Sequence, residues 1–222
     1  RVIHYFTKFD SKTTTMNRYT IIPDGMKRTR FVFAAVCILA FPLFLRPQSA
    51  NDWENPSLTG ISNEPPHASF ITYPSEKEAL SNQRESSPCY RSLNGDWRFH
   101  WSENPGSKPE DFYKDSFDAS DWKTIPVPGT IEMQGYGYPI YVNQPYEFIH
   151  LMKPDPPRVP EDYNPVGAYL TEFEIPSGWS DMDIFLQFGS VKSFFYAYLN
   201  GHRIGMGKDA KTPVEFNITP YL

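Results

Sequence analysis

The sequence is poor in cysteine, in clustered basic residues and in metal-binding patterns. Its two cysteines are Cys37, inside an apolar run that we expect to be removed, and Cys89, which leaves one thiol and so neither an internal disulfide nor a zinc site. The formal net charge is −5, and beyond residues 27–30 no Lys/Arg cluster occurs, so we expect no nucleic-acid partner. No phosphate loop, nucleotide fingerprint or metal-ligand spacing is present, and none of the five histidines neighbours a nucleophile or a metal partner.

Long hydrophobic runs are also scarce. The one conspicuous example, FVFAAVCILAFPLFL, has 15 residues, fewer than the roughly 20 needed to cross a bilayer. It follows the basic stretch MKRTR, which begins at Met26, and precedes the small residues Ser49 and Ala50, a pattern typical of a secretory signal peptide. The alternative is a membrane span. We predict a signal peptide over 26–50, export to the periplasm or the extracellular space, and an upstream extension over 1–25 with no folded role.

The overall amino-acid composition favours a loop-rich β protein. The chain is 40% hydrophobic and 21% charged, as in globular proteins, with 22 prolines and 16% aromatic residues. Leu93, Trp97, Phe99 and Trp101 share one parity and predict a strand with a core face. Asn200-Gly201 between alternating runs predicts a hairpin. Further strands are expected over 169–175, 183–188, 194–199, 202–205 and 214–218, which together indicate an all-β sandwich.

Residues 125–148, IPVPGTIEMQGYGYPIYVNQPYEF, are the most distinctive stretch. Prolines exclude a helix interior at its start, and glycines then separate aromatic residues. Four tyrosines surround one amide, Asn143, an arrangement suited to a polyol with an apolar face. The competing interpretation is an aromatic sandwich edge whose rings are simply core. The tyrosines are Tyr136, Tyr138, Tyr141 and Tyr146.

The stretch PIYVNQPYEF resembles the segment leading into the galactose pocket of glycoside hydrolase family 2 β-galactosidases. RSLNGDWRFHW, FDASDWKTIPVPGTIEMQGYG, NPVGAYLTEFEIPSGW and LNGHRIGMGKDAKTPVEFNI are similar to further family segments and stand in the same order. The resemblance implies a truncated galactose-binding-like jelly roll over 91–222, incomplete at its C-terminal end. It also implies an N-terminal arm over 51–90, in which Ser75 and Glu78 suggest a capping box and a short helix over 76–86.

The resemblance further implies an enzyme that hydrolyses terminal β-D-galactosides with retention in carbohydrate metabolism. Its two catalytic glutamates would lie on a barrel domain absent from this chain, so the fragment alone is expected to be inactive. Asn143 would bind galactose hydroxyls, and Gln144 would line the same wall of the galactose pocket. No metal site is expected within the fragment, whereas the full-length enzyme would use Mg²⁺ and Na⁺ and form a homo-oligomer.

The sequence gives no catalytic role to the acidic residues that could be mistaken for catalytic ones. Asn63-Glu64 repeats the family's Asn-Glu order but precedes two prolines, and we interpret it as coincidence. The acidic pairs 110–111 and 161–162 lie in polar loops. Two alternative functions stay open: a stand-alone carbohydrate-binding module, and the same domain of a sister β-glucuronidase or β-mannosidase. The reading frame beyond Leu222 would discriminate the module from the enzyme.

Overall fold

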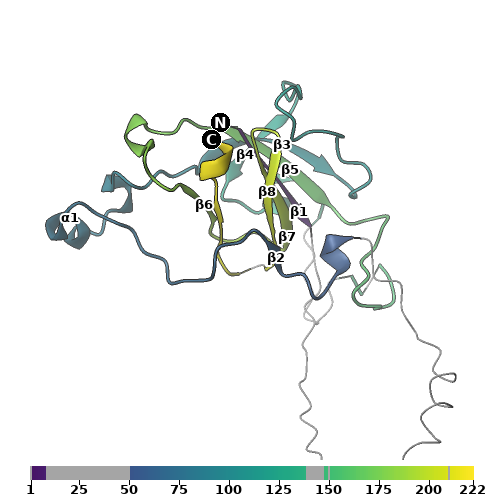
Figure 1. The fold of residues 1–222 in the computed structure, drawn as a ribbon. Coiled ribbons are helices and arrows are strands. Elements are labelled where there is room, and N and C mark those ends of the chain that lie inside the picture. Colours follow the sequence, from purple (N-terminus) through teal and green to yellow (C-terminus); the bar gives the residue numbers. More distant parts are fainter. Residues whose placement is uncertain (1, 9–50, 139–147, 150, 210) are drawn as a thin grey trace, which may run out of the picture.

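The computed structural model describes residues 2–8, 51–138, 148–149, 151–209 and 211–222, with the backbone alone for 2–8. Within these residues two antiparallel sheets form an all-β sandwich, which confirms the predicted fold class (Figure 1). The larger sheet has the order β2-β8-β7-β1-β5-β3-β4, and the smaller pairs β6 with β9. The strands are β1 Val2–Lys8, β2 Gly60–Ile61, β3 Gly95–Ser102, β4 Lys123–Val127, β5 Val166–Glu172, β6 Phe185–Phe188, β7 Phe194–Leu199, β8 His202–Gly207 and β9 Val214–Asn217.

Helical structure is limited to short pieces. The α-helix α1 covers Glu76–Leu80, and the Ser75 Oγ accepts a hydrogen bond from the Glu78 N–H at 3.3 Å, as the capping pattern predicts. The helix ends earlier than expected because Asn82 has a φ of 51°, which a right-handed helix cannot contain. Five 3₁₀ turns are described: η1 Asp52–Glu54, η2 Arg84–Ser86, η3 Glu132–Gln134, η4 Ser177–Trp179 and η5 Thr219–Tyr221.

The core lies between the two sheets. Trp97 and Phe99 on β3 are 5% and 2% exposed, and they pack with Leu186 and Phe188 of β6 and Phe216 of β9 in one cluster. The alternation in β3 therefore points its large rings inward, as the sequence indicates. Leu93 and Trp101, which share that parity, are partly buried against the same cluster.

The chain reverses between β7 and β8 at the predicted hairpin. Asn200 and Gly201 have φ angles of 48° and 76°, so both central residues are left-handed, as a type I′ turn requires. Leu199 then pairs with His202, which sets the register of two strands in the middle of the larger sheet.

The first residues of the chain have a regular structure that the sequence analysis does not predict. Sequence reasoning gives 1–25 no folded role, whereas Val2–Lys8 forms β1, antiparallel to β5 on one side and to β7 on the other. Residues with high strand propensity fill this position, where β5 and β7 would otherwise each present an unpaired edge. The domain limits at 25 and 50 fall outside the described residues and stay predictions, as does the signal peptide.

No helix in the described parts of the chain has the length and hydrophobicity to cross a bilayer. The arm of residues 51–90 carries α1 well away from the sheets, at the far left of Figure 1, before the chain enters β3.

Candidate functional site

The segment that the sequence singles out is held at both ends by buried structure. It begins in β4, where Ile125 is 1% exposed and pairs with Trp97 of β3. It ends at Phe148, which has no exposed surface and packs with Val159, 5% exposed. The carbonyl of Phe148 accepts hydrogen bonds from the Leu151 and Met152 N–H groups at 2.9 and 3.0 Å. The described residues on the two sides of the segment are therefore packed, in β4 on one side and against Val159 on the other.

Two tyrosines at the start of this segment have different surroundings. Tyr136 contacts the core ring of Phe99 edge-on, with centroids 4.7 Å apart. Tyr138 is 49% exposed and stacks on Tyr163 with centroids 5.0 Å apart and an interplanar angle of 10°. Gly137 between them has a φ of 64°, a conformation in which glycine carries no strain. Of the two interpretations of the aromatic cluster, Tyr136 fits core and Tyr138 fits a surface site.

The loop bearing Tyr163 is tied to the end of β3. The Asn164 N–H donates to the Glu103 carbonyl at 2.9 Å, and the Asn164 side-chain amide donates to the Pro160 carbonyl at 3.1 Å. The Asn104 amide donates to the Asp162 carbonyl at 3.2 Å. Burial raises the pKa of the Tyr163 hydroxyl, and the neighbouring Tyr138 adds to the effect. The ring of Tyr163 is thus a positioned support for Tyr138, which sequence reasoning missed because 25 residues separate the two.

Three buried side-chain atoms near this loop make no hydrogen bond. They are the indole nitrogen of Trp101, the hydroxyl of Ser102 and the amide oxygen of Asn164. Trp101 and Ser102 end β3, and Asn164 bonds to the next residue, Glu103. Buried polar groups in native proteins nearly always have a partner. Trp101 and Ser102 are neighbours on β3, so their side chains point to opposite faces of the sheet and the three atoms are separate unsatisfied groups.

Asn143 and Gln144, the predicted sugar-binding residues, fall in 139–147 and lie outside the described residues. So do Tyr141 and Tyr146 of the aromatic cluster. The structure gives the positions flanking them, Tyr138 and Phe148, and the predicted roles of Asn143 and Gln144 stay predictions.

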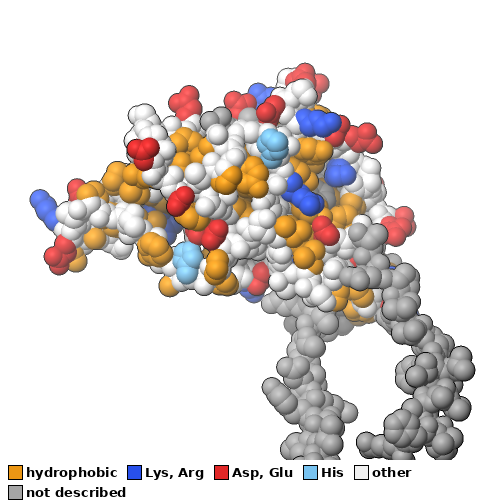
Figure 2. All heavy atoms as spheres, in the orientation of Figure 1, with side chains coloured by type: hydrophobic (Ala, Val, Ile, Leu, Met, Phe, Trp, Pro, Cys, Tyr) orange, Lys and Arg blue, Asp and Glu red, His pale blue; other side chains and the backbone are white. Residues whose placement is uncertain are grey.

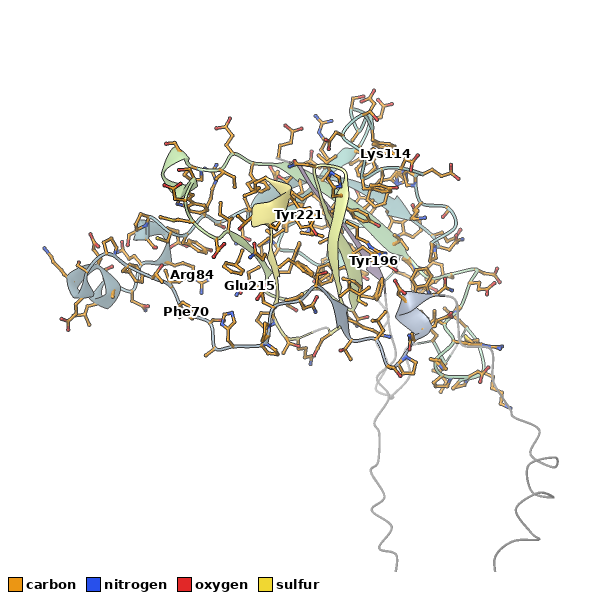
Figure 3. All side chains as sticks on the ribbon, viewed as in Figure 1. Phe70, Arg84, Lys114, Tyr196, Glu215 and Tyr221 are labelled. Carbon is orange, nitrogen blue, oxygen red and sulfur yellow. The ribbon has the colours of Figure 1, made fainter. Side chains whose placement is uncertain are left out.

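The start of the arm braces the same region. Glu54 in η1 is 9% exposed, and its carboxylate accepts from the Val159 N–H at 3.2 Å and from the Asn51 amide at 3.1 Å. The Tyr196 hydroxyl of β7 donates to the Asp52 carboxylate at 2.7 Å, so η1 is attached to the sheet as well (Figure 3). Burial, followed by the bond to Asp52, raises the pKa of Tyr196.

The acidic residues weighed as catalytic candidates have structural surroundings. The Glu64 N–H donates to the Glu215 carbonyl at 2.9 Å, and the Asn63 amide, oriented to satisfy its neighbours, donates to the carbonyls of Ile61 and Met206. Asn63-Glu64 thus attaches the arm to β8 and β9. In the pair 110–111, Asp111 bonds to the Lys114 ammonium at 2.7 Å, which lowers the pKa of the exposed carboxyl.

A groove of about 1710 Å³ lies elsewhere, between the arm and the open side of the core. Trp97, Phe173, Leu186 and Phe188 line it from the sandwich, and residues 64–72 and 89–94 line it from the arm. Figure 2 shows hydrophobic side chains gathered along the arm at the left of the view. Neither Tyr138 nor Tyr163 lines this groove. Its sandwich wall consists of core residues, so the groove is a part of the core surface that the arm covers incompletely.

No group of three or more His, Cys, Asp or Glu side chains suited to a metal occurs in the described parts of the chain.

Comparison with known proteins gives consistent matches. The family model "Glycosyl hydrolases family 2, sugar binding domain" matches residues 90–222. A "Beta-galactosidase" of Priestia megaterium is 39% identical over 172 residues, covering 77% of this chain and 17% of its own length. A "Beta-galactosidase" of Halalkalibacterium halodurans is 41% identical over 163 residues, covering 72% and 16%. A "Beta-galactosidase large subunit" of Lactobacillus helveticus is 34% identical over 188 residues, covering 79% and 30%. The chain thus spans about one sixth of the length of the first two relatives.

Proposed function

Since this chain belongs to glycoside hydrolase family 2 and matches its sugar-binding domain, we propose that it is that domain of an exported β-galactosidase. The whole enzyme hydrolyses terminal β-D-galactosides with retention in carbohydrate metabolism. The observation that carries the proposal is the family match over residues 90–222, which includes the segment between Tyr136 and Phe148. The fixed ends of that segment support it, because a pocket wall needs a rigid base.

The contribution of this domain is binding rather than bond cleavage. Asn143 donates and accepts hydrogen bonds with galactose hydroxyls, and Gln144 lines the same wall. The two carboxylates that retaining hydrolysis requires belong to a barrel domain of the same longer chain. Mg²⁺, Na⁺ and homo-oligomer contacts are likewise proposed for the longer enzyme.

Replacing Asn143 in an enzyme that contains this segment tests the wall assignment. A hydrogen bond to a sugar hydroxyl is worth about 0.5–1.5 kcal/mol net, and its loss in a dry pocket costs about 1–3 kcal/mol because it leaves a buried partner unpaired. Contacts that tighten in the transition state affect the rate as well as the affinity. Asn143→Ala should therefore lower kcat/KM for lactose by roughly ten- to a hundredfold with little change in stability.

Asn63→Ala is the matched control, because it removes an asparagine whose described contacts are backbone carbonyls of β2 and β8. It should lower stability and leave kcat/KM per folded molecule unchanged. If Asn143→Ala behaves like this control, Asn143 is structural and the wall assignment is wrong.

The 222-residue chain by itself should hydrolyse no aryl galactoside above background, since both carboxylates lie elsewhere. Turnover that persists after rigorous removal of host enzyme, and that comigrates with the chain in gel filtration, would overturn this assignment.

If the signal peptide over 26–50 is removed on export, the secreted protein should begin near Asn51. N-terminal sequencing of material from the medium or periplasm checks this, and a start at or before Met26 would contradict it.

A further inference from the structure

The strand β1 lies between two strands that are far from it in the sequence. Val2–Lys8 pairs antiparallel with β5 on one side and with β7 on the other (Figure 1). Among the described strands, β1 alone joins the group β2-β8-β7 to the group β5-β3-β4. Without β1, the facing sides of β5 and β7 would each present a row of unpaired N–H and C=O groups. The two strands therefore form the walls of a slot that holds one strand.

Both walls of this slot are held by contacts that do not involve β1. On its other side β5 pairs with β3, and β7 pairs with β8 through the Asn200-Gly201 hairpin. Tyr169 of β5 and Leu199 of β7 belong to the core cluster that also contains residues of β6 and β9. The slot is thus part of the sandwich, whereas its occupant is connected to the arm only through residues 9–50.

The register defines which residues the slot accepts. Positions 3, 5 and 7 of the chain pair with Leu199, Ala197 and Phe195 of β7, which are 0%, 0% and 1% exposed. Positions 4 and 6 pair with Tyr198 and Tyr196, which are partly buried in a different cluster. Because directly paired residues of neighbouring strands lie on the same face, the slot favours a strand with apolar or aromatic residues on both faces. The segment VIHYFTK has such residues at positions 2, 3, 5 and 6, and most of its residues have high strand propensity.

Export creates a conflict for this strand. If the signal peptide over 26–50 is removed, as proposed above, Val2–Lys8 is no longer connected to the domain. The walls would then lose the hydrogen-bond partners that β1 supplies, whereas buried backbone groups in native proteins nearly always have partners. A different strand therefore has to take the place of β1 in the exported protein.

From these observations we propose that the slot between β5 and β7 is a strand-binding site and that Val2–Lys8 is a replaceable occupant of it. The ligand is an extended peptide segment of the length of β1, bound through its backbone as in strand addition to an exposed sheet edge. In the exported enzyme, a strand from the remaining part of the longer chain replaces β1. This replacement rests on the proposed function, whereas the strand-binding site itself does not.

Exchange of a labelled peptide into the cut chain tests the site. A recognition sequence for a specific protease is inserted after Thr20 of the 222-residue chain, the purified chain is cut there, and fluorescein-labelled RVIHYFTKFD is added in excess. The labelled peptide should displace the cut segment, comigrate with the domain in gel filtration and be competed by the unlabelled peptide. In the uncut chain the tethered strand competes at a high effective concentration, so uptake should be at least about tenfold lower.

Two matched variants of the peptide test whether binding uses the strand ladder. Tyr5→Pro changes a position that pairs with both walls, and proline there lacks a backbone N–H and is unsuited to a central strand. It should weaken uptake at least about tenfold. Asp10→Pro lies beyond the last residue of β1 and should leave uptake unchanged. Amide hydrogen exchange should show residues 166–172 and 194–199 protected when the native peptide is bound, which locates the site.

Equal uptake of the native and Tyr5→Pro peptides would overturn the site, because binding would not depend on the strand ladder. A cut chain that releases its own segment and takes up no peptide would also overturn it, whether or not the domain stays folded by circular dichroism. A cut chain that keeps its own segment and exchanges none of it would show that β1 is permanent and contradict its replacement. None of these results affects the sugar-binding assignment, which the kinetics of Asn143→Ala decide separately.

Discussion

Two aromatic regions of this chain have similar composition and opposite surroundings. On β3, Trp97 and Phe99 are almost fully enclosed between the sheets. At the tyrosine corner, where Tyr138 stacks on Tyr163, the Tyr138 ring is half exposed. The enclosed region also satisfies its polar atoms, as the Trp97 indole donates to the Leu93 carbonyl at 2.8 Å. Trp97 and Phe99 are therefore structural residues of the core, whereas Tyr138 keeps about half of its side chain in contact with solvent.

The backbone explains why the two regions diverge. Residues of β3 alternate between faces, so every second ring is driven into the core. After β4 the chain passes through Gly135 and Gly137, with φ angles of 89° and 64°, and the alternation is lost. Tyr136 still reaches the core ring of Phe99, whereas Tyr138, two residues later, does not.

The largest expected difference is in stability. Trp97→Ala leaves a cavity in an enclosed core and should lower the free energy of unfolding by about 3–5 kcal/mol. Tyr138→Ala removes one partly exposed stacking contact and should cost no more than about 1.5 kcal/mol. Urea denaturation of both variants measures the difference. Equal losses would mean that the corner is core after all, and Leu80→Ala, 77% exposed, gives the baseline.

A smaller difference in stability is expected between two buried serine hydroxyls. Ser87 and Ser102 are both 4% exposed, but the Ser87 hydroxyl donates to the Thr72 carbonyl at 2.6 Å, whereas the Ser102 hydroxyl has no partner. Ser87→Ala should therefore cost about 0.5–1.5 kcal/mol, and Ser102→Ala should be neutral or stabilising, because it removes an unsatisfied polar group.

The same denaturation midpoints check the serine pair. A loss for Ser102→Ala as large as that for Ser87→Ala would show that the Ser102 hydroxyl has a hydrogen-bond partner in solution.

Sequence patterns predict the enclosed region better than the corner. The parity of Trp97 and Phe99, the hairpin at Asn200-Gly201 and the cap at Ser75 follow from local rules, and all three are confirmed. Local rules also place the strand 169–175 three residues late, because Gly167 and Ala168 look like poor strand formers. In β5, position 167 has no room for a side chain, because a Cβ there would lie 2.8 Å from the ring of Phe99.

The corner escapes such reasoning because it joins residues from distant parts of the chain. Tyr163 lies in a proline-rich loop whose position depends on Asn104 and Asn164, and neither asparagine belongs to a recognisable pattern. The resemblance that carries the family assignment names Asn143 and Gln144 and says nothing of Tyr138 or Tyr163. A stacked pair without a sequence signature emerges only when the loop is folded against the end of β3.

The smallest expected effect concerns two histidines, His100, which is partly buried, and His67, which is exposed. His67 on the arm is exposed, with its Nε2 2.9 Å from Glu215 of β9 and its Nδ1 2.9 Å from the Ala68 carbonyl. Only the imidazolium can donate to both acceptors, and the hydrogen bond to Glu215, followed by that to Ala68, raises the pKa of His67 above 6.5. His100 on β3 packs edge-on against Trp122, and burial lowers its pKa below 6.5.

These shifts have opposite consequences for stability. The His67 contribution is fully present below pH 6.5 and is lost as pH rises through the raised pKa of the folded state. The His100 contribution is present above pH 6.5 and is lost as pH falls through that value towards the lowered pKa of the folded state. Melting temperatures at pH 5.5 and pH 8.5 measure both. His67→Gln should remove a loss of stability on the alkaline side, and His100→Gln should remove a loss on the acid side. If His67→Gln leaves the difference between the two melting temperatures unchanged, the bond between the arm and β9 does not persist in solution. The arm would then be held next to β9 by the Glu64 backbone bond, while the Asp52 and Glu54 contacts still attach its first residues.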